Sequence, residues 1–411
     1  MRVAVALAAG LRVDEIGGGV ENAAMMIRSV RAPLAVLLLG GALAAQATWV
    51  VSGGGTALQN AINTAAPGDV LDVQPGSYTA VTCSKGLRIA LHSGAQITTV
   101  SAATTAMTVT NLPASETFQV DGGIVAGIAA SQCTGTIVVD GVSVQLFAVF
   151  PFTACSGPIV FDGVSYPTIP PYTSGHLQFS NCPQVTFRDS AVPQLTITAS
   201  RVVLQNCTVR PYGFSAPGVS LVSGALTIAG GYTTGSAAVF FSIARPAIRI
   251  DAGELVLTGG AVVEALQYLA VSATAPGILA NGGTIRRDPS ASVIGTPPII
   301  GPATVLATPT PSLAVTHTAT TMSVTASGQA GDFLLTFAGL MAPPFPTPWG
   351  DAWLSPADPI LDISQVQASG TIGFTRTFTT VPPFVLLTLQ PVAISPAGAL
   401  QVGAPTRFAW N

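Results

Sequence analysis

Short apolar runs separated by Gly, Asp, Asn or Ser dominate the middle of the chain. The runs hold about four to six residues, too few for an amphipathic helix and typical of β-strands bounded by turns. Two segments, Cys133–Ser143 (CTGTIVVDGVS) and Cys155–Ser165 (CSGPIVFDGVS), match at eight of eleven positions. A third, Cys182–Ser190, keeps the same offset of seven residues from cysteine to aspartate. These similarities predict a repeated structural unit.

Looser copies of the strand and turn extend the repeat in both directions. A unit of about 23 residues accommodates three short strands and three turns, and such units stack at the strand spacing of about 4.8 Å. The sequence therefore predicts an all-β fold, a parallel β-helix of about eight or nine coils over residues 48–295. The residues taken to mark the turn after each strand are Gly122, Gly141, Gly163, Ser190, Cys207, Gly230, Gly259 and Gly282.

The N-terminal end of the repeat region carries a helical pattern. Leu58, Ala61, Ile62 and Ala65 have helical spacing, and the sequence Pro-Gly-Asp at residues 67–69 follows as a stop. An open solenoid end needs a cap, so we expect this helix to cover the first coil.

The residues after the helical pattern resemble the entry into the pectate-lyase-like family of right-handed parallel β-helices. The resemblance rests on Gly68–Tyr78 (GDVLDVQPGSY) and Gly86–Ile89 (GLRI) and covers roughly residues 49–295. In that family a short helix plugs the first coil before a strand that ends in Pro-Gly-x-Tyr. The resemblance implies a right-handed β-helix. It leaves the activity open, because function must be argued from a site.

Two further segments follow the repeats. Residues 296–312 are rich in proline, which favours extended backbone, and are predicted to form a linker. From residue 313 to residue 411, apolar runs alternate with Pro/Gly turns, which predicts a small antiparallel β-sandwich. Trp349 and Trp353 in this module are candidates for stacking on a sugar ligand, and packing within the module is the alternative.

Composition narrows the choice of function class. Charged residues make up 8% of the chain and hydrophobic residues 49%, and so high an apolar content argues against disorder. The net charge is -3, with Lys85 as the only lysine and no basic run. Nucleic acid is therefore not expected as a partner, and the sequence is silent about oligomeric state.

Residues 1–47 have the pattern of a leader. A secretory signal peptide is predicted at about residues 26–47, where basic residues precede an apolar run at Ala32–Leu43. Small residues at Ala42–Ala44 and Ala45–Ala47 suit a signal peptidase. The run is shorter than the roughly 20 residues that span a bilayer, so no transmembrane segment is expected in the mature chain. We expect a secreted or cell-surface protein whose partner is a polysaccharide or a cell-envelope component.

Candidate catalytic residues are few. A glycoside hydrolase needs two carboxylates about 5 to 9.5 Å apart, and Asp140, Asp162 and Asp189 could stack at the spacing of the coils. Each aspartate ends a predicted strand, so a structural role in the turns is the alternative. Arg188 adjoins Asp189, and an ion pair there is as plausible as a site. No metal-ligand spacing appears and no cofactor is expected; calcium is the candidate cofactor under the lyase alternative, because lyases often use it.

The arginines and cysteines complete the candidates. Arg201 and Arg210, with Arg188, would suit an acidic ligand or serve as solvated surface charge. If Cys133 and Cys155 share one column of the stack, their Cα atoms lie close enough for a disulfide, and buried free thiols are the alternative. The leading hypothesis is a non-catalytic β-helix that is a structural or ligand-binding scaffold. The alternative is a polysaccharide lyase or glycoside hydrolase with a diverged active site.

Overall fold

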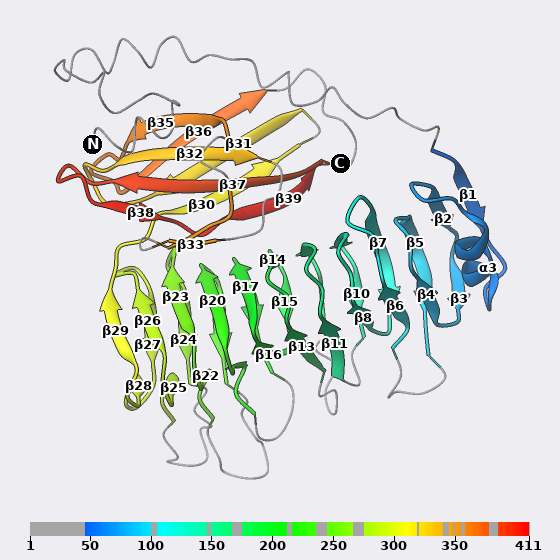
Figure 1. The fold of residues 1–411 in the computed structure, drawn as a ribbon, viewed down its shortest axis with the longest axis horizontal. Coiled ribbons are helices and arrows are strands. Elements are labelled where there is room, and N and C mark those ends of the chain that lie inside the picture. Colours follow the sequence, from blue (N-terminus) through cyan, green and yellow to red (C-terminus); the bar gives the residue numbers. More distant parts are fainter. Residues whose placement is uncertain are drawn as a thin grey trace. The chain divides into compact units, whose positions relative to one another are not determined.

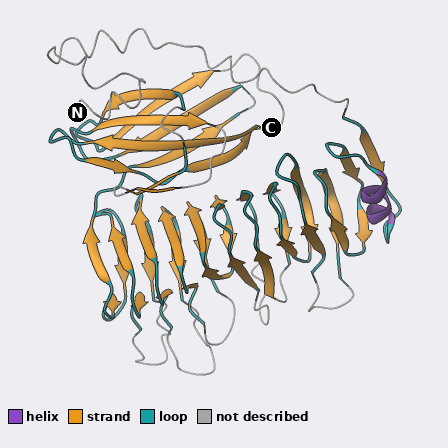
Figure 2. Ribbon diagram, viewed as in Figure 1, coloured by secondary structure: helices purple, strands orange, loops and turns teal. Residues whose placement is uncertain are grey.

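Three parallel sheets run through residues 46–312 and form a parallel β-helix, which confirms the predicted architecture (Figure 1). A second unit, built mainly from residues 313–405, consists of antiparallel sheets. The computed structural model describes residues 46–410 except 100–104, 146–148, 167–174, 212–215, 236–244, 266–274, 319, 340–344, 348–349, 355–357 and 378–384. Within these ranges the regular structure is almost entirely strand, with one helix, α3 (Figure 2). The predicted signal peptide lies outside the described residues.

The longest sheet has 14 strands, and twelve of them follow one another along the stack, more than the eight or nine coils predicted. Strands β3 (Gly76–Tyr78) and β10 (Ser143–Val144) lie off this path. The twelve in order are β1 (Thr48–Val51), β2 (Val70–Val73), β5 (Arg88–Ile97), β7 (Thr117–Val125), β9 (Thr136–Asp140), β12 (Ile159–Asp162), β14 (Val185–Arg188), β17 (Ser200–Gln205), β20 (Gly224–Ala229), β23 (Glu254–Thr258), β26 (Thr284–Arg287) and β29 (Thr304–Ala307).

Two shorter sheets complete the coils. The 10-stranded sheet contains β4 (Val81–Cys83), β6 (Met107–Thr110), β8 (Ile128–Ser131), β11 (Val149–Thr153), β13 (His176–Ser180), β16 (Gln194–Thr198), β19 (Val219–Leu221), β22 (Ile248–Ile250), β25 (Ile278–Ala280) and β28 (Ile299–Ile300). The 5-stranded sheet contains β15 (Ala191–Val192), β18 (Thr208–Val209), β21 (Tyr232–Thr234), β24 (Val262–Glu264) and β27 (Ser292–Ile294).

Alternation along each strand separates an inner row of side chains from an outer row. Because the coils pair in register, the same inner position is apolar in coil after coil. One inner row consists of Ile137, Ile159, Val185 and Val202, all at most 1% exposed. Burial of these stacked rows is the main favourable contribution to folding of the unit.

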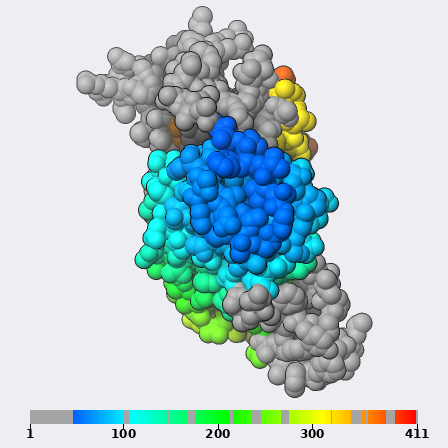
Figure 3. Space-filling view, turned by 90° about the vertical axis from the view of Figure 1, so that its right-hand side faces the viewer, coloured from blue at the N-terminus to red at the C-terminus, as the bar shows by residue number. Residues whose placement is uncertain are grey.

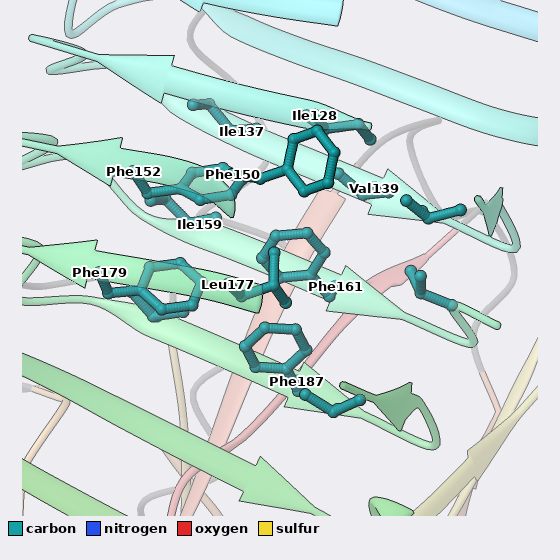
Figure 4. Close-up of a cluster of buried hydrophobic side chains, with 14 of the residues drawn as sticks. Ile128, Ile137, Val139, Phe150, Phe152, Ile159, Phe161, Leu177, Phe179 and Phe187 are labelled. Carbon is teal, nitrogen blue, oxygen red and sulfur yellow. The ribbon is translucent and has the colours of Figure 1, made fainter. Parts of the chain in front are cut away.

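In the middle coils of the β-helix, the interior contains a cluster of aromatic rings (Figure 4). Phe152 and Phe179 of the 10-stranded sheet stack with ring centroids 5.0 Å apart. Phe161 and Phe187 of the 14-stranded sheet stack at 4.3 Å. The two stacks meet edge to face, with the Phe152 and Phe161 centroids 5.6 Å apart, so four rings from neighbouring coils form one cluster.

The turn after each strand of the long sheet uses the left-handed backbone conformation. Gly141 and Gly163 have φ of 59°, and Asp189 and Asn206 take the same place with φ of 46° and 50°. Asp and Asn tolerate this region better than other residues with a Cβ. The predicted turn residues Ser190 and Cys207 therefore lie one residue after the actual turn residues, Asp189 and Asn206. Gly282 was assigned to the wrong corner, because it precedes β26 instead of following a strand of the long sheet.

The predicted helical cap is confirmed as α3 (Ala57–Thr64). Its Leu58 and Ile62 are buried against the first coils, and Ala65 just beyond the helix is buried as well. Tyr78, at the end of the Pro-Gly-x-Tyr sequence, is also buried, and its hydroxyl lies 2.8 Å from the carbonyl oxygen of Gln74. Figure 3 looks onto this end of the β-helix.

Asp69→Asn is expected to weaken the capped end near neutral pH. The Asp69 carboxylate accepts hydrogen bonds from the backbone N–H of Ala66 (2.9 Å) and from Nε1 of Trp49 (3.0 Å). The backbone N–H of Ala47 donates a third at 3.0 Å. These bonds, in that order of importance, hold the pKa of Asp69 below its ordinary value.

A carboxyl with a lowered folded pKa stabilises the fold above its unfolded pKa, about 4, and this stability is lost as the pH falls through the folded value. Thermal unfolding at pH 7 and at several values below pH 4 measures the effect. The wild type should lose stability on acidification, and Asp69→Asn should start lower at pH 7 and lose less. Equal losses in both proteins would contradict this role of Asp69.

The proline-rich stretch is not a linker over its whole length. Residues 299–300 form β28 on β25, and residues 304–307 form β29 on β26, so this segment is the last coil of the solenoid. Proline fits here because it occupies the turns between the strands, where no ladder hydrogen bond is lost. The division of the chain into two units falls between Ser312 and Leu313.

The C-terminal module contains two main antiparallel sheets, as predicted. One consists of β30 (Ser312–His317), β31 (Thr321–Ser327) and β36 (Thr371–Thr377). The other consists of β32 (Phe333–Gly339), β35 (Ile360–Gln365), β37 (Val385–Ile394), β38 (Leu400–Val402) and β39 (Thr406–Trp410). A two-stranded ribbon, β33 (Phe345–Thr347) with β34 (Gly350–Ala352), completes the module.

Candidate functional site

A row of polar side chains lies at the end of the strands on the outer face of the long sheet. Asp121, Asp140 and Asp162 pair directly with one another in successive coils. Arg188 pairs with Asp162 in the next coil, and Gln205 pairs with Arg188. We call these five residues the outer polar row. They lie outside the core because each follows a strand residue that points inward, such as Phe161 before Asp162.

Asp162 and Arg188 form the ion pair at the centre of the outer polar row. Nε of Arg188 lies 3.0 Å from Oδ1 of Asp162, and both side chains are largely buried. Burial raises the pKa of Asp162 to about 6, although the Arg188 charge opposes the shift, and the charge of Asp140 adds to it. The structure thus brings together three of the predicted catalytic candidates, Asp140, Asp162 and Arg188.

Asp189 does not join this row. It lies one residue later, in the left-handed turn, where it accepts a 2.7 Å hydrogen bond from Nδ2 of Asn206. Its Oδ2 is 3.3 Å from Nε of Arg188, so the ion pair predicted between these neighbours is present. The prediction that Asp140, Asp162 and Asp189 stack is therefore wrong for Asp189. Arg188 occupies the position next to Asp162 in the following coil. The turn interpretation holds for Asp189 itself.

The three candidate arginines do not converge on one site. Arg188 ends β14, whereas Arg201 is near the start of β17 and pairs with Ala225 of the next coil. Arg210 follows β18 in the 5-stranded sheet, and its backbone N–H donates to Val192. A single ligand carboxylate could not be held by all three guanidinium groups.

Of the two tryptophans predicted as candidates for stacking on a sugar, the structure describes the surroundings of Trp353. Trp353 is 2% exposed, and its backbone N–H donates to Oε1 of Gln390. A ring buried to this degree presents no face to a sugar, so packing within the module is the supported alternative. Trp349 lies outside the described residues.

Cys133, Cys155 and Cys182 occupy one corner of three successive coils. Each thiol donates to the carbonyl oxygen two residues earlier, that of Ser131, Thr153 or Ser180. The hydrogen bond with Cys155 and burial raise the pKa of Cys133. All five cysteines are buried and free, so the structure contains the buried free thiols of the alternative and no disulfide between Cys133 and Cys155.

The sequence reasoning missed Asp121 as a member of the outer polar row. Nε of Arg88 lies 2.5 Å from Oδ2 of Asp121, and Nε2 of Gln119 donates to its Oδ1 at 2.6 Å. The available signal was the Asp-Gly pair at residues 121–122, which repeats at 140–141 and 162–163. Three such pairs in consecutive repeats place three aspartates at one strand position.

Comparison with protein-family models and with curated proteins found no match for this chain. Over the described residues, no helix is long and apolar enough to cross a membrane. The same residues contain no group of three His, Cys, Asp or Glu side chains placed to hold a metal ion. Any functional assignment therefore depends on the geometry of the outer face.

Proposed function

We propose that this protein is a secreted or cell-surface scaffold that binds a carbohydrate or another cell-envelope component along the β-helix without transforming it. The observation that carries the proposal is the pairing of charges between neighbouring coils. Arg88 pairs with Asp121 of the next coil, Arg188 with Asp162, and Arg286 with Glu254. Charges that neutralise one another in this way hold adjacent coils in register and do not converge on a reacting group.

Export is the second part of the proposal. Basic residues, an apolar run and small residues near Ala44 and Ala47 support it. In the folded unit Ala47 donates its N–H to Asp69, and its carbonyl oxygen accepts from Val70. Cleavage after Ala44 would keep both hydrogen bonds, whereas cleavage after Ala47 would remove them. N-terminal sequencing of the exported protein distinguishes the two sites.

A glycoside hydrolase or polysaccharide lyase is the second candidate, and one observation favours it. Asp162 has a pKa of about 6 and lies beside Asp140. A carboxyl with a raised pKa next to a second carboxyl is the arrangement that glycosidases use for general acid catalysis. The ion pair with Arg188 weighs against this role, because it keeps the charged form of Asp162 in place.

The exported protein is expected to bind a polysaccharide and to leave it intact. A panel of acidic and neutral polysaccharides, with and without calcium, tests both parts through binding, release of reducing ends and absorbance of unsaturated products. Asp162→Asn is the informative variant, and Asp189→Asn is its control because Asp189 lies beside the same arginine in the turn. Turnover that Asp162→Asn abolishes and Asp189→Asn retains would replace the scaffold by an enzyme. Folded protein that binds nothing in the panel would contradict the carbohydrate part.

A further inference from the structure

The two edges of the long sheet are both unpaired among the described strands. β1 has β2 as its neighbour, and β29 has β26. A free edge presents a row of backbone N–H and C=O groups that can pair with another strand. Proteins usually protect such edges with lysine, proline or a bulge, but β1 reads TWVV and β29 reads TVLA.

The C-terminal end of the β-helix exposes its inner row. Leu255 and Ile285 are fully buried in successive coils, but Val305, the next residue in this row, is 48% exposed. Apolar side chains in the other strands of the last coil are exposed as well, including Ile294 of β27 and Ile300 of β28. Among the described residues, no further coil covers the apolar core at this end.

Among the residues that the structure describes, only helix α3 and β1 lie over the N-terminal end of the β-helix, and they cover it in part. Helix α3 covers the interior with Leu58 and Ile62, yet Trp49 and Val50 of β1 remain 38% and 69% exposed. Trp49 pairs with the buried Leu71 and so continues an inner row, like Val305 at the other end. Both ends thus present an apolar inner row beside an uncharged free strand.

We propose that the β-helix associates head to tail with further copies of itself, β1 of one chain adding as a parallel strand to β29 of the next. A second copy fits because every pairing in this sheet is parallel and β1 and β29 have four residues each. β1 can therefore take the place of the next coil on β29 without reversing direction. The contact joins two different surfaces and leaves one free edge at each end, so it generates an open filament.

The backbone geometry identifies which N–H groups make this contact. Val70 N–H donates to Ala47 and Gln74 N–H to Val51, so the alternate residue Val50 directs its N–H to the free edge of β1. Thr304 and Thr308 donate to the preceding coil, so Val305 directs its N–H to the free edge of β29. Proline at residue 50 or 305 removes a donor that the fold itself does not use.

Sedimentation velocity of the purified protein over a concentration series tests the proposal. The wild type should form oligomers whose size grows with concentration. Val50→Pro and Val305→Pro should each be monomeric, and alanine at either position, which keeps the N–H, should still associate. An equimolar mixture of the two proline variants should give dimers and nothing larger, because each supplies the edge that the other has lost.

Three results would overturn head-to-tail association. They are a wild-type monomer at all concentrations, oligomers that persist in both folded proline variants, and a wild-type assembly that stops at two. Circular dichroism confirms that each variant is folded. The inference does not depend on the proposed function, since a monomer could still bind a polysaccharide, and association could occur without any ligand.

Discussion

Phe161→Ala should lower the free energy of unfolding of the β-helix by about 3 to 5 kcal/mol. Phe161 is 1% exposed, and its ring stacks on Phe187 and meets Phe152 and Phe179 edge to face. Truncation removes the transfer free energy of the ring and leaves a cavity between two sheets. The neighbouring coils cannot close this cavity, because their spacing is fixed by the strand ladders.

Urea denaturation followed by circular dichroism measures this loss. Phe333→Ala is the matched control, since Phe333 is 40% exposed and belongs to the C-terminal module. The same truncation there should leave the unfolding of the β-helix unchanged. A loss below about 1 kcal/mol for Phe161→Ala would contradict the prediction, because it would mean that the aromatic cluster contributes little to the stability of the β-helix.

The sequence predicted the β-helix because its inner rows repeat the same apolar positions in every coil. Ile137 and Ile159 stack in the structure as their matching sequences predict. The number of coils was underestimated, because glycine marks only part of the turns. After β2, for example, the turn begins with Gln74, and β1, β2, β5 and β29 lie outside the span from Gly122 to Gly282 over which the repeat was counted.

Only part of the candidate site was predicted, because the spacing between cysteine and strand changes in one coil. Ile137 and Ile159 lie four positions after Cys133 and Cys155. Val185, the equivalent strand position, lies only three positions after Cys182. A shift of one residue exchanges the inner and outer faces of a strand. Alignment on the cysteines therefore selected Asp189 for the row that Arg188 occupies. The residue that lies beside Asp162 is determined by the strand pairing between coils, and this pairing cannot be read from the sequence.

The second glycine column of the β-helix was missed altogether, and it carries the other large expected effect. Gly224, Gly253 and Gly283 stack at the corner that leads into the long sheet, with φ between 86° and 102°. A Cβ on Gly253 would lie 2.3 Å from the carbonyl oxygen of Gly224 in the preceding coil. The coils approach so closely here that backbone occupies the space of a side chain.

Gly253→Ala should therefore destabilise the β-helix by about 3 kcal/mol or more, from backbone strain and from the clash together. Gly141→Ala is the matched control, because Gly141 also has positive φ, 59°, but a Cβ there meets nothing within 4 Å. That substitution should cost about 1 kcal/mol, the strain alone. Gly141→Asn should cost less still, since Asn206 adopts this conformation in a neighbouring coil. Chemical denaturation of the three variants gives the comparison. Equal losses for Gly253→Ala and Gly141→Ala would show that the close approach of the coils relaxes at no cost.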